Sequence, residues 1–132
     1  MHGGMQNPKN LIVGEYAHRL AIATYRHTAS FPASKRFGLT SQMRRGAVSI
    51  VSCIAEGCGQ RSNLELVHYL YMSAAAASEL LCQLRMATEL GFGGPSSAAQ
   101  LRDDAPRVAR MPTRLITYHR APPAWKRNEG RP

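Results

Sequence analysis

Cysteine is scarce in this sequence, and so are acidic side chains and long apolar runs. The three cysteines, Cys53, Cys58 and Cys82, are an odd number and lack the spacing of a metal site. Cys53 and Cys82 lie within apolar helical patterns, so we expect buried free thiols, which are typical of a reducing cytoplasm. We therefore predict no bound metal and no cofactor.

No apolar segment is long enough to span a membrane, because the alanines at 74–77 lie between His68 and the polar residues Glu79 and Gln83. Residues 1–10 contain no apolar core of the kind found in signal peptides. We therefore predict a cytoplasmic protein that does not associate with membranes. A chain of 132 residues is one domain by default, and it is long enough to bury a core.

The shortage of acidic residues makes the chain basic. It carries 8 Asp and Glu against 17 Lys and Arg, a formal net charge of +9. Residues 1–100 hold nine basic and five acidic side chains, and residues 101–132 hold eight and three. Such a balance favours nucleic acid or another anionic partner. The alternative is a basic tail that only keeps the protein soluble.

The segment 36–61 predicts a helix with a wide apolar face. Two adjacent stripes follow helical spacing, and the remaining polar seam is narrow and rich in serine. A surface helix of a monomer needs an apolar arc of roughly 100°, and this one has about twice that. We therefore expect the helix to be covered on more than one side by self-association. The stripes are Leu39, Met43, Ala47, Ile50 and Ile54, and Val48, Val51 and Ala55.

Four helices are predicted in all, at about 8–29, 39–57, 63–90 and 97–118. Asn7 caps the first, Ser62 with Glu65 forms a capping box for the third, and Ser97 with Gln100 forms one for the fourth. Pro112 bends, splits or shortens the fourth helix. The fold class is all-α, an antiparallel up-and-down four-helix bundle over residues 1–119, and residues 120–132 are a disordered basic tail.

Several smaller predictions accompany this outline. Gly57 and Gly59 end the second helix, since glycine accepts the left-handed conformation. In the loop 30–38, we expect both phenylalanines to tuck under the bundle. The two histidines of the first helix, His18 and His27, are placed on the surface. The third helix also has more apolar surface than a monomeric bundle needs, which favours an interface.

The blocks RFGLTSQMRRGAVSI and IAEGCGQRS resemble the small four-helix-bundle proteins encoded in intervening sequences of bacterial large-subunit ribosomal RNA. Relatives in that family serve as accessory subunits of diversity-generating retroelements. The resemblance runs from about Leu11 to Phe92, and more weakly to Tyr118. It implies a cyclic homo-oligomer, a pentamer in crystallised relatives, in which basic residues from several copies share one face. The sequence departs from the family pattern at Gly14, Cys53 and Pro112.

Catalysis has little support in the sequence, and we predict that the protein is not an enzyme. A Cys58–His68 nucleophile pair would lie far apart. The carboxylates Glu56 and Glu79 match family positions that resemble structural partners of arginine. We therefore expect Arg44 or Arg45 to pair with them between helices or between subunits, because an unpaired buried charge is costly.

Binding of RNA or DNA is the better candidate. Arginine suits phosphate contacts because its guanidinium is planar and always charged. No RNA-recognition, helix-turn-helix or zinc-finger signature is present, so we expect backbone-directed, salt-dependent binding without sequence specificity. Two alternatives stay open: Arg44 and Arg45 hold subunits together, or the protein is an adaptor that docks a partner such as a reverse transcriptase. The predicted nucleic-acid-binding residues are Lys35, Arg36, Arg44, Arg45, Arg61 and Arg19, with Arg26 nearby.

Overall fold

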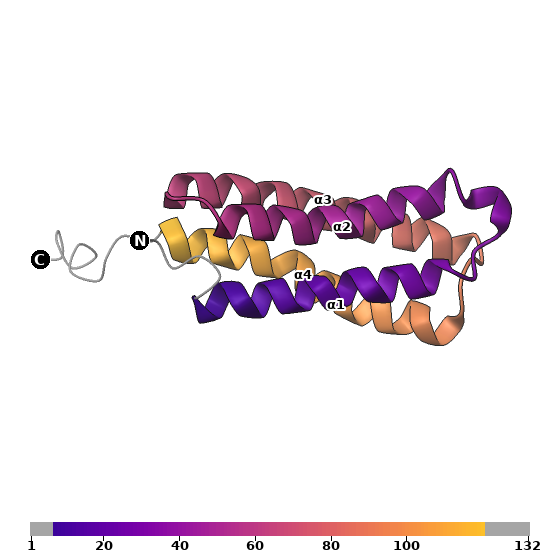
Figure 1. The fold of residues 1–132 in the computed structure, drawn as a ribbon. Coiled ribbons are helices and arrows are strands. Elements are labelled where there is room, and N and C mark those ends of the chain that lie inside the picture. Colours follow the sequence, from indigo (N-terminus) through magenta and orange to yellow (C-terminus); the bar gives the residue numbers. More distant parts are fainter. Residues whose placement is uncertain (1–6, 121–132) are drawn as a thin grey trace, which may run out of the picture.

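The computed structural model describes residues 7–120, which form an up-and-down bundle of four long helices (Figure 1). Helix α1 packs against α2 and α4, and α3 packs against the same two helices on the other side. The α1–α2 and α3–α4 connections lie at one end of the bundle, and the α2–α3 turn lies at the other (Figure 1). The elements are α1 (Pro8–Thr28), the 3-10 turn η2 (Ala33–Lys35), α2 (Leu39–Cys58), α3 (Asn63–Glu89) and α4 (Pro95–Arg120). The predicted fold class is confirmed.

Two helices begin at the capping residues that were predicted from the sequence. Asn7 Oδ1 accepts a hydrogen bond from the Lys9 amide at 3.0 Å, and Pro8 occupies the first turn of α1. Ser62 Oγ accepts from the Glu65 amide at 3.2 Å at the start of α3. Of the tail predicted at 120–132, Arg120 is instead the last residue of α4, and residues 121–132 lie outside the described residues. Among residues 7–120, no helix is both long and apolar enough to cross a membrane.

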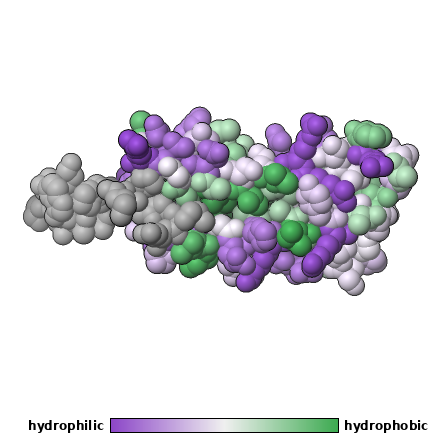
Figure 2. Space-filling model, viewed as in Figure 1, coloured by the Kyte–Doolittle hydropathy of each residue, from purple (hydrophilic) through white to green (hydrophobic). Residues whose placement is uncertain are grey.

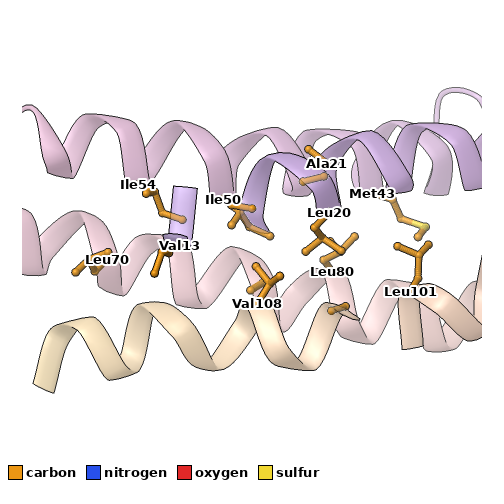
Figure 3. Packing of buried hydrophobic residues seen from close by; sticks show 14 of the residues in the cluster. Val13, Leu20, Ala21, Met43, Ile50, Ile54, Leu70, Leu80, Leu101 and Val108 are labelled. Carbon is orange, nitrogen blue, oxygen red and sulfur yellow. The ribbon is translucent and has the colours of Figure 1, made fainter. Parts of the chain in front are cut away.

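The core runs along the axis of the bundle and draws on all four helices (Figure 3). The predicted stripe of α2 supplies Met43, Ile50 and Ile54, each at most 1% exposed, and α3 supplies Leu66 and Leu70. Burying a side chain of this size contributes about 1.5–3 kcal/mol. The core stripe of α2 is thus confirmed. The second stripe is partly exposed in a single chain, since Val48 and Ala55 face solvent.

Helix α4 begins earlier and runs further than its sequence suggested. It starts at Pro95, so Ser97 is not its N-cap, and the Ser97 hydroxyl instead donates to Gly94 O at 3.2 Å. The helix is neither split nor shortened at Pro112, because it continues to Arg120. A proline removes one backbone hydrogen bond from a helix. Pro112 is fully buried in the core, and burial of its apolar ring acts against that loss.

Four further predictions fail for identifiable reasons. Phe37 is 93% exposed, because the α1–α2 connection tucks in only Phe31. Cys82 is exposed, since it lies on the outer side of α3. Gly59 is the C-cap of α2, as predicted, but its φ of −83° shows that the helix ends without the expected left-handed residue. His27 is 1% exposed, because the α3–α4 connection passes over its ring and only a residue without a Cβ fits there, at Gly93.

Gly57 lies inside α2 at a close approach to α3. A Cβ built there would lie 3.0 Å from Tyr69 Cβ and 3.1 Å from Leu66 Cδ1. Gly57→Ala is therefore expected to lower the free energy of unfolding by about 1–3 kcal/mol, because overpacking outweighs the gain in helix propensity. Gly46→Ala is the matched control, since its Cβ would come no closer than 3.8 Å to Gln83 Oε1. Urea unfolding checks both variants, and an equal gain in stability would contradict the close approach.

Two histidines, the buried His27 and the half-buried His119, predict a pH dependence of stability. Burial lowers the pKa of His27 and of His119 below the ordinary histidine value. Below about pH 6.5 the unfolded chain then binds more protons than the folded chain, so stability is complete above that pH and falls as the pH drops. Urea unfolding from about pH 8 to about pH 5 checks this. His27→Gln should flatten the curve, because it removes the histidine whose pKa burial lowers.

Candidate nucleic-acid interface

A groove about 590 Å³ in volume opens where the start of α2 meets the C-terminal part of α1. Three arginines and two aromatic residues line it, and no carboxylate does. We call it the arginine groove. Its lining residues are Tyr25, Arg36, Phe37, Thr40, Ser41, Arg44, Arg45, Val48 and Ser49.

Arg44 forms part of the wall of the arginine groove. Its Nε donates to Thr28 Oγ1 at 2.9 Å, and its Nη2 donates to Tyr25 O at 3.3 Å. Its guanidinium carbon lies 4.7 Å from the centre of the Tyr25 ring, within the range of a cation–π contact. These contacts join α2 to α1. Arg44 therefore holds the groove together and fixes a positive charge in it.

Arg36 and Arg45 are exposed and carry the other two positive charges of the groove. Among residues 7–120 the salt bridges join Arg19 to Glu15 and Arg85 to Glu89, so neither groove arginine is neutralised by a carboxylate of its own chain. The guanidinium carbon of Arg36 lies 5.8 Å from the centre of the exposed Phe37 ring. The groove thus combines positive charge with an open aromatic surface.

The other predicted binding residues lie elsewhere. Lys35 is next to the groove, but its Nζ lies 5.8 Å from the centre of the Phe92 ring. Arg19 and Arg26 line a second groove, between α1 and α4. Arg61 follows the C-terminal end of α2, which is about 30 Å from its start at 1.5 Å per residue. The six predicted residues therefore do not form one surface within a single chain.

The predicted ion pairs are not formed inside the chain. Glu56 and Glu79 are exposed, and neither belongs to a salt bridge among residues 7–120. Arg44 makes its contacts with α1 instead. Pairing of these carboxylates with arginine between subunits stays a prediction.

The thiol considered as a nucleophile is poorly placed for catalysis. Cys58 is 2% exposed, and burial raises the pKa of its thiol, so the reactive thiolate is disfavoured. His68 is exposed and its ring packs edge-on against Tyr69. Across residues 7–120, no group of three or more His, Cys, Asp and Glu side chains is arranged to hold a metal ion.

Three residues of the arginine groove were not predicted as site residues from the sequence. In the sequence, Tyr25 fits the pattern of an ordinary amphipathic helix. In the structure its side chain is 43% exposed and its ring contacts the guanidinium of Arg44. Phe37 was expected to be buried. Thr40 lies next to the wide apolar stripe of α2. Its place in the lining of the groove depends on the folded chain and is not visible in the sequence. The position of Phe37 directly after Arg36 was the one available hint.

Comparison with known proteins supports the fold. The family described as 23S rRNA-intervening sequence protein matches residues 9–114 of the chain. The chain is also similar to a crystal structure of a protein of unknown function from the S23 ribosomal protein family of Bacteroides thetaiotaomicron VPI-5482, with a TM-score of 0.72 and 17% identity. The similarity covers 83% of this chain and 98% of that one, and at this identity it shows the fold alone. No curated protein matches the chain.

Proposed function

The chain belongs to the family of 23S rRNA-intervening sequence proteins, and we propose that it is a non-enzymatic, oligomeric protein that binds nucleic acid through the arginine groove. The observation that supports this proposal best is the set of three arginines beside two aromatic residues, with no carboxylate in the lining. Arginines contact phosphates, and exposed aromatic rings stack on bases of any identity. The binding therefore lacks sequence specificity.

Self-association completes the proposal. Helix α3 exposes Met72 and Met86 on its outer side at 46% and 55%. Hydrophobic surface also runs along the middle of the face seen in Figure 2. Large exposed apolar side chains on the outer side of a helix favour an interface. The pentameric ring implied by the family resemblance would bring several arginine grooves together and raise the apparent affinity.

The test is fluorescence anisotropy of short labelled RNA and DNA strands across a salt series. The affinity should fall steeply between about 50 and 200 mM salt, because each neutralised phosphate releases counterions. Absence of binding at low salt would contradict the proposal.

The exposed apolar side chains of α3 favour one second candidate, an adaptor that docks a protein such as a reverse transcriptase. A partner protein that co-purifies without nucleic acid would support the adaptor.

A further inference from the structure

The start of α2 differs from the starts of α1 and α3 in having no side-chain cap. Gly38 occupies the N-cap position, and the first turn contains no acidic residue. The first amide with a partner one turn back is that of Gln42, which donates to Gly38 O at 3.0 Å. The amides of the first turn are therefore available, and the helix dipole adds partial positive charge at this end.

The hydroxyl of Thr40 gives independent evidence for a ligand at this point. Thr40 is 7% exposed and lines the arginine groove, and its Oγ1 is buried without a hydrogen-bond partner among residues 7–120. Leaving a buried hydroxyl unpaired is unfavourable. A ligand oxygen at the start of α2 would satisfy it.

Other threonines in the same structure show why Thr40 is left without a partner. A helical threonine commonly donates to the carbonyl four residues earlier. Thr24, Thr88 and Thr117 do so, at 2.8, 2.8 and 3.2 Å. The residue four before Thr40 is Arg36, which precedes α2, so Thr40 has no helical carbonyl to use.

We propose that the N-terminus of α2, Thr40 Oγ1 and the guanidinium groups of Arg36 and Arg45 form a binding site for one phosphate group. This inference rests on the proposed function and identifies the phosphate as that of a single-stranded nucleic acid. The reason is Phe37, which is 93% exposed beside Arg36. An unpaired base can stack on that ring, whereas the bases of a duplex cannot reach it.

The experiment compares the full-length protein with Thr40→Val, which replaces only the hydroxyl by a methyl group. Thr113→Val, at an exposed position of α4 outside the groove, is the control. Phosphorus NMR titration with inorganic phosphate and anisotropy with single-stranded RNA are run on all three proteins. We expect Thr40→Val to lower the affinity for inorganic phosphate and the affinity for single-stranded RNA by about tenfold each. This is the effect of losing a hydrogen bond to a charged group. Its stability to urea without phosphate should be unchanged or higher, because an unpaired hydroxyl is removed.

The outcomes separate the phosphate site from the proposed function. If Thr40→Val binds RNA and phosphate as tightly as the wild type, the site is wrong while nucleic-acid binding stands. If phosphate binding falls tenfold but the wild type binds no RNA, the site is a free-phosphate site and the proposed function fails. If Thr40→Val changes only the assembly state, a carboxylate of a second copy occupies the site and the inference is overturned. Phe37→Ala should weaken RNA binding and leave phosphate binding unchanged.

Discussion

The double substitution Arg36→Gln, Arg45→Gln is expected to lower the affinity for single-stranded RNA by about a hundredfold. A hydrogen bond to a charged group contributes about 1.5–3 kcal/mol, so each lost arginine–phosphate contact corresponds to at least about tenfold. The slope of log affinity against log salt should become shallower by about 0.7, since the two arginines contact one phosphate and each phosphate neutralised in a single strand contributes about 0.7. Anisotropy titrations at several salt concentrations measure both effects. Arg44 is left in place because it joins α2 to α1.

The control for this prediction is Arg19→Gln, Arg61→Gln, which removes the same charge from positions outside the arginine groove. Its affinity should stay within a few-fold of the wild type, because long-range attraction is screened beyond about 10 Å at ordinary salt. If both double variants lose affinity equally, net charge governs binding and the groove has no special role.

The substitution Met72→Glu is expected to convert an assembled protein into single chains. Met72 lies on the outer side of α3 at 46% exposure, where a second copy would cover it. A carboxylate buried there without a partner would be strongly destabilising, whereas Met72→Leu conserves volume and should leave the assembly intact. Light scattering on a sizing column measures the mass of both variants.

An unchanged mass for Met72→Glu would place the interface away from this face of α3. A wild-type protein that stays a single chain at high concentration would show that self-association is wrong. Loss of assembly should also weaken RNA binding, because the grooves of separate chains no longer act together.

Much of the fold follows from local signals in the sequence. Asn7 and Ser62 mark helix starts through hydrogen bonds that depend on neighbouring residues alone, and both starts are confirmed. His27 could not be placed in this way, because its burial depends on a connection that folds back from a distant part of the chain. The prediction that Pro112 splits or shortens the fourth helix was wrong for a similar reason. The packing of Pro112 in the core depends on the assembled bundle and not on neighbouring residues in the sequence.

Only some residues of the candidate site could be predicted from the sequence. Arg36, Arg44 and Arg45 were identified from their type and spacing, and the structure brings them into one groove. Their different roles were not predictable, because the role of Arg44 depends on the ring of Tyr25 across the helix pair. Thr40 was also missed, since a missing hydrogen-bond partner is visible only when the surroundings are known.

The most direct test is ultraviolet crosslinking of the wild-type protein to a single-stranded oligouridine, with the crosslinked peptide identified by mass spectrometry. The arginine groove predicts that the crosslinks fall on Phe37 or Tyr25, the two aromatic residues in its lining. They should disappear in Arg36→Gln, Arg45→Gln. Crosslinks confined to α4, which contributes no residue to that lining, would contradict the account.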